Sequence, residues 1–277
     1  FQFSSKILKK YGIEVSFINY QNLEELEATI KDNTAMIYIE TPSNPLLKVS
    51  DINAIVEIAK KHNIKTVADN TFMTALYQKP LDLGCDIVIE SLTKFVNGHS
   101  DVTAGCAVTN NEEIANEICL LQKNFGGILG VEDAWLILRG MKTMGLRMEK
   151  SVENAKILTR FLETQDKIKK VYYPNLTSCK FYDIHTEQAS SGGAVFSFEF
   201  FEQDDLKTFL KKIKIPIYAI SLGGVESIIS HTETMSHACM SEEERLAQGV
   251  TQTLLRFSCG VEDSEDLIED LKQALNN

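Results

Sequence analysis

The stretch "CDIVIESLTKFVNGHSD", residues 85–101, places a lysine directly after a strongly apolar run. The apolar run covers residues 87–89 and is typical of a strand buried in a parallel sheet. Lys94 follows this run, and Ser91 and Thr93 place hydroxyl groups beside it. A lysine at the end of a buried strand can bind an anion or act as a Schiff-base nucleophile, although a lysine considered alone is just as commonly an exposed surface charge.

The sequence around this stretch alternates strand and helix patterns. Strands are predicted at residues 14–20, 35–40, 65–70, 85–91 and 104–110, and helices at residues 3–11, 22–30, 52–62 and 112–124. This order predicts an α/β fold in which helices cover a mostly parallel sheet.

The pattern changes in the second half of the chain. A long helix is predicted at residues 131–161, and residues 192–200 alternate apolar and polar residues like a half-exposed strand. Further helices are predicted at residues 204–214 and 264–275, with a strand at 254–260 between them. We therefore expect a large domain at residues 1–149 and a smaller α+β domain at residues 150–277.

Composition limits the possible partners. The 277 residues are 44% hydrophobic, which is enough for a full core, and the formal net charge of −11 argues against nucleic acid or an anionic membrane. No apolar run has transmembrane length, and none of the six cysteines forms a C-x-x-C pair. We expect a cytoplasmic protein with reduced thiols and no membrane or nucleic-acid partner.

Three predicted strands end in polar residues that suit one cofactor. Asn44 follows the strand at 35–40, Asp69 ends the next strand, and Lys94 lies 25 residues further on, beside Ser91 and Thr93. Ligands of open α/β sheets bind at the carboxyl ends of strands, so these side chains are expected to meet. The set suits pyridoxal 5'-phosphate (PLP), because an amine condenses with its aldehyde, a carboxylate keeps its ring nitrogen protonated and hydroxyls bind its phosphate.

Two other motifs carry no separate site. His231 and His237 are six residues apart without a third ligand nearby, so we expect structural histidines and no metal. The pair Gly223 and Gly224 predicts a turn and not a nucleotide fingerprint, because no G-x-G-x-x-G pattern follows a strand there.

The polar strand ends belong to motifs spread along the chain: "ETPSNP" (40–45), "VADNTF" (67–72), "SLTKFVNGHSDVTAG" (91–105), "LRGMKTMGLRM" (138–148), "SLGGVESIISH" (221–231) and "LLRFSCGVED" (254–263). In this order they resemble the signature blocks of the cystathionine/methionine-metabolism family of PLP-dependent enzymes. The resemblance covers nearly the whole chain. It implies the PLP-dependent transferase-like fold (fold type I), with a smaller C-terminal domain.

The resemblance also implies roles at the cofactor. Lys94 is the catalytic residue and holds PLP as an imine, while Asp69 pairs with the pyridine nitrogen. Ser91 and Thr93 contact the phosphate. Asn44 lies near the phenolic oxygen of the cofactor and the substrate carboxylate.

Two residues of the later motifs are implied to bind substrate. Arg256 corresponds to the arginine that binds the α-carboxylate, a role that suits a bidentate guanidinium better than a lysine. Ser221 is implied to help position the same carboxylate.

The start of the chain and one loop depart from the family pattern. The family carries a ring-stacking tyrosine, a glycine-rich phosphate turn and a tyrosine–arginine pair upstream of these motifs, and residues 1–277 contain no counterpart. Because the sequence opens at Phe1 within an expected helix, we expect a further segment before it. Thr232 replaces the proline that usually follows the histidine of "SIISH", which leaves substrate preference open.

The activity implied by the resemblance is that of a PLP-dependent carbon–sulfur lyase. We expect β-elimination of cystathionine to homocysteine, pyruvate and ammonia, a transsulfuration reaction of cysteine and methionine metabolism, in a homotetramer whose subunits share active sites. The alternatives are γ-elimination, as in cystathionine or methionine γ-lyases, and γ-replacement, as in cystathionine γ-synthases. A non-catalytic PLP-binding or scaffold subunit and a class I aldolase are the alternatives from other classes.

Overall fold

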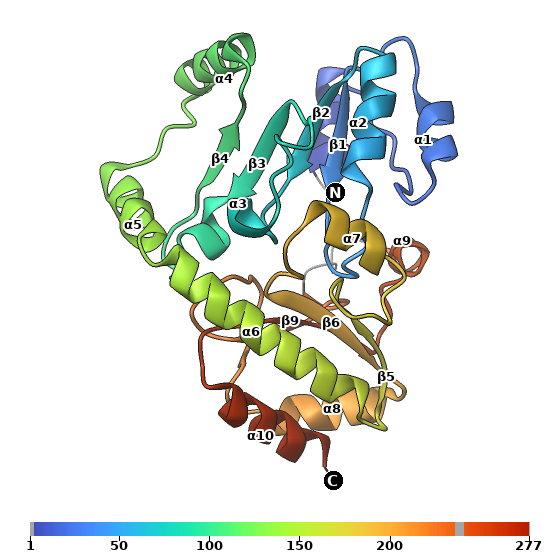
Figure 1. Ribbon diagram of the computed structural model, residues 1–277, viewed down its shortest axis with the longest axis vertical. Helices are drawn as coiled ribbons and strands as arrows, with labels where there is room; N and C mark the ends of the chain where they lie inside the picture. The colour runs from blue at the N-terminus through green and yellow to red at the C-terminus, as the bar shows by residue number, and fades with distance from the viewer. Residues whose placement is uncertain (1–2, 236–240, 277) are drawn as a thin grey trace.

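A computed structural model describes residues 3–235 and 241–276, and these residues form two sheets (Figure 1). The first sheet has the order β1-β2-β3-β4, with β1 to β3 parallel and β4 antiparallel to β3. Its strands are β1 (Met36–Glu40), β2 (Lys65–Asp69), β3 (Ile87–Ser91) and β4 (Gly105–Val108). The predicted mostly parallel sheet is confirmed.

Helices and helical turns accompany these strands. They are η1 (Phe3–Ile7), η2 (Leu8–Tyr11), α1 (Leu23–Thr29), α2 (Ile52–Lys61), α3 (Thr74–Tyr77), η3 (Leu92–Val96), α4 (Glu112–Phe125) and α5 (Val131–Met141). Asp51 caps α2 by accepting a hydrogen bond from the Ala54 amide at 2.9 Å. The apolar side of α2, including Ile52 and Ile55, packs against Ile39 of β1 and fixes the helix on the sheet.

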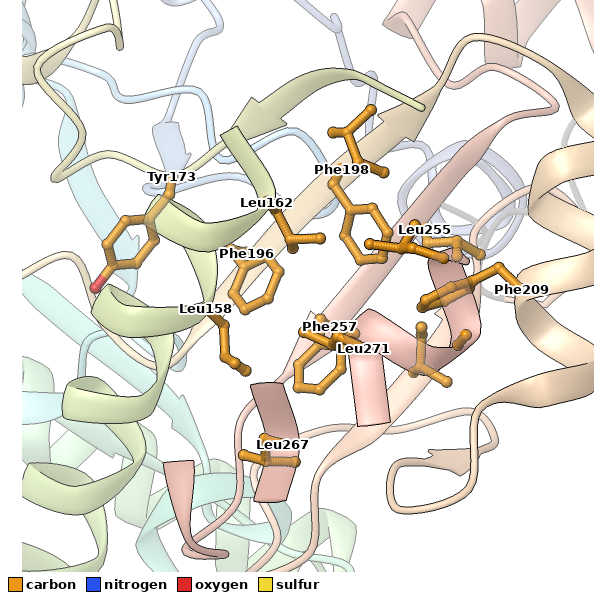
Figure 2. Close-up of a cluster of buried hydrophobic side chains, with 14 of the residues drawn as sticks. Leu158, Leu162, Tyr173, Phe196, Phe198, Phe209, Leu255, Phe257, Leu267 and Leu271 are labelled. Atoms are coloured by element: carbon orange, nitrogen blue, oxygen red, sulfur yellow. The ribbon is translucent and has the colours of Figure 1, made fainter. Parts of the chain in front are cut away.

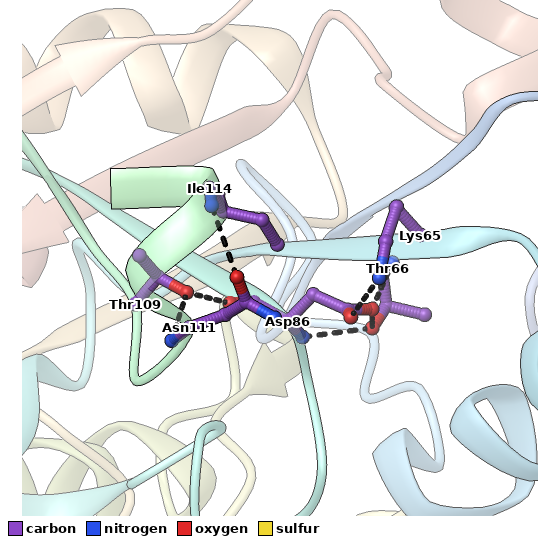
Figure 3. A network of polar contacts seen from close by, with 6 residues as sticks. All are labelled: Lys65, Thr66, Asp86, Thr109, Asn111 and Ile114. Carbon is purple, nitrogen blue, oxygen red and sulfur yellow. Dashed lines mark hydrogen bonds and ion pairs between the residues drawn. The ribbon is translucent and has the colours of Figure 1, made fainter. Parts of the chain in front are cut away.

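A polar network joins β2, β3 and β4 at the edge of the sheet opposite the carboxyl ends of the parallel strands (Figure 3). Asp86, just before β3, accepts hydrogen bonds from the Thr66 amide at 2.8 Å and from Lys65 Nζ at 3.1 Å. Thr109, just after β4, donates to the Asp86 carbonyl at 2.7 Å. One aspartate therefore links β2, β3 and β4, which keeps their far ends in register.

The second sheet is mostly antiparallel and has the order β5-β6-β9-β8-β7. Its strands are β5 (Ile168–Tyr172), β6 (Val195–Phe200), β7 (Ile217–Tyr218), β8 (Ile228–His231) and β9 (Leu254–Ser258). The accompanying helices are α6 (Met144–Glu163), α7 (Tyr182–Gln188), α8 (Gln203–Lys212), α9 (Glu242–Gln248) and α10 (Ser264–Leu275). The predicted domain boundary after residue 149 falls inside α6 and stays a prediction.

Aromatic side chains form the core of this second sheet (Figure 2). The rings of Phe196 on β6 and Phe257 on β9 stack with centroids 5.1 Å apart. Leu158 and Leu162 of α6 belong to the same buried cluster, which also includes Leu267 of α10. The alternation along β9 leaves Arg256 pointing away from this core, toward the first sheet.

The strand β6 is more buried than its alternating sequence predicts. Every residue of β6 is buried, so the expectation of a half-exposed strand is wrong. The polar side is covered because Ser197 donates to the Pro45 carbonyl at 2.6 Å, and Pro45 belongs to the loop after β1. This contact joins the two sheets.

Two other local predictions are wrong. Residues 14–20 contain no strand in the structure, because no neighbouring strand of the described chain pairs with them. The helix predicted at residues 131–161 is divided into α5 and α6. The division lies at Lys142 and Thr143, where Arg147 Nη2 donates back to the Gly140 carbonyl at 2.9 Å.

Candidate active site

Lys94 lies in the helical turn η3, directly after the carboxyl end of β3. Its backbone leaves helical geometry, with φ −95° and ψ −134°. The Lys94 side chain is half-buried, and its Nζ donates a hydrogen bond to Ser221 Oγ at 2.7 Å. The turn around Gly223 packs on the same segment, since a Cβ there would lie 2.7 Å from the Phe95 amide nitrogen. Lys94 is therefore held by packing as well as by its hydrogen bond.

The pKa of the Lys94 amine lies below its ordinary value. Burial is the main cause, because it disfavours the charged ammonium, and the positive charge of Arg256 adds to it. A lowered pKa leaves more of the amine neutral near neutral pH, and the neutral amine is the nucleophile that condenses with an aldehyde.

Arg256 extends from β9 and is only 3% exposed. Its Nη1 donates to Asn44 Oδ1 at 3.1 Å, and its Nη2 donates to the Ser221 carbonyl at 2.6 Å and to Ser230 Oγ at 3.3 Å. The Nε of Arg256 is buried without a partner, and no carboxylate within the described residues lies at ion-pair distance. Burial lowers the pKa of Arg256 to about 10. A buried cation without a counter-ion suits an anionic ligand.

Asp69 ends β2, beside Glu40 at the end of β1. Its Oδ2 accepts a hydrogen bond from Tyr38 Oη at 3.0 Å, and its Oδ1 accepts one from the Thr71 amide at 3.0 Å. Glu40 in turn accepts from the Asn44 amide at 2.8 Å. Asp69 is therefore an oriented carboxylate at the same sheet edge as Asn44.

The two side-chain hydroxyls predicted to bind the phosphate have different surroundings. The Ser91 amide donates to Thr71 Oγ1 at 2.9 Å, and within the described chain its hydroxyl has no partner and is free for a ligand. The Thr93 hydroxyl is already engaged, because it donates to the Ala104 carbonyl at 3.2 Å and accepts from the Ala104 amide at 2.9 Å. Thr93 and Ser221 both line a cavity of about 440 Å³.

Hydrogen bonds connect four of the seven residues predicted from the sequence. They form a continuous series from Lys94 through Ser221 and Arg256 to Asn44. The other three, Asp69, Ser91 and Thr93, lie at the carboxyl ends of β2 and β3, the edge from which Lys94 also extends.

Three contributors were not identified from the sequence. Tyr38 and Thr71 orient Asp69, and Ser230 contacts Arg256 from the adjacent position on β8. Thr71 lies in the "VADNTF" motif and Ser230 in "SIISH", so their motifs were the available signal. Nothing local in the sequence distinguished Tyr38 from any other strand tyrosine.

His231 has both ring nitrogens within hydrogen-bond distance of protein groups. Nδ1 lies 2.9 Å from Thr234 Oγ1, and Nε2 lies 2.9 Å from the Gln252 carbonyl. These contacts fit the expected structural role. The second histidine considered, His237, lies outside the described residues.

The donor set as a whole fits PLP. A half-buried amine, an oriented carboxylate and a free hydroxyl lie at one sheet edge, next to a buried guanidinium that has an unpartnered N–H. The fold and the site define a PLP-dependent α/β enzyme.

Comparison with known proteins identifies the family. The chain matches the family described as "Cys/Met metabolism PLP-dependent enzyme" over residues 1–276 and belongs to it. It is 46% identical over 275 residues to the cystathionine beta-lyase of Bacillus subtilis, covering 99% of this chain and 70% of that protein. It is 43% identical over 273 residues to the cystathionine gamma-lyase of the same organism, covering 99% of this chain and 72% of that protein.

A solved structure shows the same fold. The cystathionine gamma-lyase from Lactobacillus plantarum, complexed with L-serine, superposes with a TM-score of 0.96 at 37% identity. The match covers 99% of this chain and 72% of that one. These similarities confirm the predicted family, the fold class, PLP as the cofactor and the class of carbon–sulfur lyases. The alternative prediction of a class I aldolase is therefore wrong.

Proposed function

We propose that the protein catalyses β-elimination of cystathionine to homocysteine, pyruvate and ammonia. The observation that carries the proposal is Arg256, a buried cation without a carboxylate partner among the described residues, which is linked through Ser221 to the Lys94 amine. This arrangement can bind an amino-acid carboxylate close to the group that moves its α-proton. The 46% identity to a cystathionine beta-lyase supports the substrate and the bond that is cleaved.

We propose that seven residues carry the chemistry. Lys94 binds the cofactor aldehyde and is the catalytic base, and Asp69 pairs with the cofactor ring nitrogen. Ser91 contacts the phosphate with its free hydroxyl, while Thr93 reaches it only by exchanging its hydrogen bond to Ala104. The remaining three, Arg256, Ser221 and Asn44, surround the substrate carboxylate, and Asn44 also lies near the cofactor.

Each of these side chains has a separate role in the proposed reaction. PLP, when bound, supplies the electron-accepting ring that makes the substrate α-proton acidic. Lys94 Nζ, which would also hold the cofactor aldehyde, would remove the α-proton as a general base when its amine is free. Arg256 and Asn44 hold the carboxylate so that the α-carbon faces Lys94. Asp69, oriented by Tyr38 and Thr71, would place its carboxyl group at the ring nitrogen.

A second candidate is γ-elimination, because the chain is also 43% identical to a cystathionine gamma-lyase. In that reaction Lys94 moves a further proton from the β-carbon before the sulfur leaves. γ-Replacement uses the same early steps and is supported by 42% identity to a cystathionine gamma-synthase of Haemophilus influenzae.

The products of one incubation separate these functions. The protein is mixed with PLP and cystathionine, and the keto acid and thiol are identified by mass spectrometry. Pyruvate with homocysteine is the expected result. Oxobutanoate with cysteine would replace the proposal with γ-elimination. PLP binding without any keto acid would also contradict it, and would indicate γ-replacement or a scaffold subunit. Lys94→Ala is the control and should yield neither product.

We also propose a homotetramer with shared active sites. Apolar side chains are exposed along α4 and α5, including Phe125 at 85% and Trp135 at 57% exposed. Exposed apolar surface of this extent is typical of a protein–protein contact. Light scattering coupled to size exclusion should give four times the monomer mass, and a fully active monomer would contradict the proposal.

A cytoplasmic location is proposed as well. All cysteines of the described chain are free thiols, as expected in a reducing compartment. Separately, no helix within the described residues is long and apolar enough to cross a membrane. Cell fractionation tests the location, and recovery outside the cytoplasm would contradict it.

A further inference from the structure

Arg147 lies in the first turns of α6 and is 8% exposed. Its guanidinium donates to backbone carbonyls on two sides. Nη1 binds the Phe95 carbonyl at 2.8 Å, and Nη2 binds the Val96 carbonyl at 3.1 Å and the Gly140 carbonyl at 2.9 Å. Nε donates to Thr143 Oγ1 at 3.1 Å. One side chain thus joins α5 and α6 to the turn that carries Lys94.

The charge of Arg147 has no carboxylate partner within residues 3–235 and 241–276. All of its acceptors are neutral, so the desolvation of the guanidinium is not offset by an ion pair. An apolar side chain of similar size is commonly as good or better for stability alone at such a buried position. The retained guanidinium therefore points to a need for its planar, multiply donating geometry.

The surrounding backbone approaches the guanidinium closely. A Cβ at Gly98, which has φ +74°, would overlap Nη1 of Arg147. A Cβ at Gly140 would likewise overlap the Asn97 carbonyl. Glycine at position 98 leaves room for the guanidinium, and glycine at position 140 lets the end of α5 approach the segment after Lys94. Both segments can therefore contact Arg147.

We propose that Arg147 is a positioning residue for Lys94. Lys94 is the residue at which η3 departs from helical geometry, and the two carbonyls bound by Arg147 belong to Phe95 and Val96, which follow it. The Gly98 amide donates to the Lys94 carbonyl at 2.7 Å and closes the same turn. The Arg147 guanidinium binds the peptide groups on the C-terminal side of Lys94. It thereby keeps Lys94 Nζ within hydrogen-bond distance of Ser221.

The inference rests on the proposed role of Lys94, and it predicts that lysine cannot replace this arginine. A lysine ammonium is a single point of charge on a flexible chain. It cannot bind three carbonyls and a hydroxyl that lie around a planar fork. Loss of any of the contacts to Phe95 or Val96 frees the turn that carries the reacting amine.

The test compares Arg147→Lys and Arg147→Met with Arg160→Lys in the PLP-loaded protein. Arg160 lies on the same helix but is exposed, so it controls for a change of charge group on α6. We expect kcat to fall about 10- to 100-fold in both Arg147 variants, as for a reacting group displaced by an ångström, while KM changes little. Hydrogen exchange at the amides of residues 95–98 should become faster, with the rest of α6 unchanged.

The outcomes are distinct. If Arg147→Met does not fold, Arg147→Lys carries the test alone. Unchanged kcat and unchanged exchange at residues 95–98 in Arg147→Lys would overturn the inference, as would faster exchange spread evenly over the whole protein. Failure of the proposed function would instead appear in the unsubstituted protein, as a borohydride-fixed label on a lysine other than Lys94.

Discussion

Lys94 Nζ and Ser221 Oγ lie 2.7 Å apart, although 127 residues separate them in the sequence. The pair joins the turn after β3 in the first sheet to the loop before β8 in the second. Ser221 has φ +84°, a left-handed conformation that is costly for a residue other than glycine. The carbonyl of Ser221 also accepts from Arg256, so one serine connects the amine to the guanidinium.

Borohydride reduction of the PLP-loaded protein should attach the label to Lys94. The reason is that its half-buried amine has a lowered pKa and lies at the carboxyl end of the sheet. Peptide mapping by mass spectrometry locates the label, and Lys94→Ala serves as the control that should remain unlabelled. A label on another lysine of the unsubstituted chain would contradict the assignment.

The pH dependence of PLP capture should reflect the charge of Arg256. Burial and Arg256 both lower the pKa of Lys94 below the ordinary lysine value, so its neutral form persists to lower pH. Capture by cofactor-free protein should therefore remain fast below the pH at which a free lysine becomes protonated. Arg256→Gln removes the positive charge, raises the pKa of Lys94 and moves the midpoint of capture to higher pH. Rapid mixing across a pH series measures the midpoint, which should not move in Arg160→Gln.

Replacement of Asp69 by Asn should spare cofactor binding and slow α-proton exchange by orders of magnitude. A neutral amide cannot keep the ring nitrogen protonated, and the ring then accepts electrons poorly. Tyr38→Phe keeps the carboxylate and removes one of its hydrogen bonds, so we expect a smaller loss of about tenfold. Exchange of the substrate α-proton in deuterated water, followed by NMR, measures both. Near-normal exchange in Asp69→Asn would exclude the assigned role.

Arg256→Lys should raise KM for amino-acid substrates about 10- to 100-fold. Loss of one charge-assisted hydrogen bond to a carboxylate costs roughly 1.5–3 kcal/mol, and about 1.4 kcal/mol corresponds to a factor of ten. PLP affinity should stay unchanged, because this arginine is assigned to substrate and not to cofactor. Steady-state kinetics and a PLP titration test the two statements, with Arg160→Lys as the control. A loss of PLP affinity with unchanged KM would assign Arg256 to the cofactor.

Two glycines with nearly the same backbone conformation allow the cost of backbone strain to be measured apart from the cost of a lost close contact. Gly126 has φ +79°, and a Cβ added there would meet no atom, whereas Gly223 has φ +81° and a Cβ there would meet the Lys94 segment. Gly126→Ala should cost about 1–2 kcal/mol of unfolding free energy from conformation alone. Gly223→Ala should cost about 1–3 kcal/mol more from overpacking, and should also lower turnover. Urea unfolding and lyase rates measure both, and equal effects would mean that the contact to Lys94 is unimportant.

The first sheet and the strand-end residues could be predicted from the sequence because each depends on local patterns. The residues of β2 and β3 have apolar runs that end in Asp69 and Ser91, and parallel pairing then places these ends together. The covering of β6 could not be predicted, because Ser197 is buried by Pro45, which lies 152 residues earlier in the sequence. Alternation indicates two faces of a strand and does not reveal what packs on the polar face.

The role of Arg256 was assigned from its motif, whereas its isolation as a cation depends on tertiary packing. No sequence pattern shows that its Nε lacks a partner or that Ser230 and Asn44 surround it. Arg147 was missed for a similar reason. Its motif was recognised, but its contacts to Phe95 and Val96 span more than 50 residues.

The position of β9 in the second sheet has a consequence for protein synthesis. β9 lies between β6 and β8 and follows both of them in the sequence, so it leaves the ribosome after them. Until it emerges, β6 can pair only with β5 and β8 only with β7, so the two halves of the sheet are not joined and Arg256 is absent from the site. Burial and Arg256 are the two causes of the lowered Lys94 pKa, so the site around this amine is completed only when the central strand of the second sheet has been made.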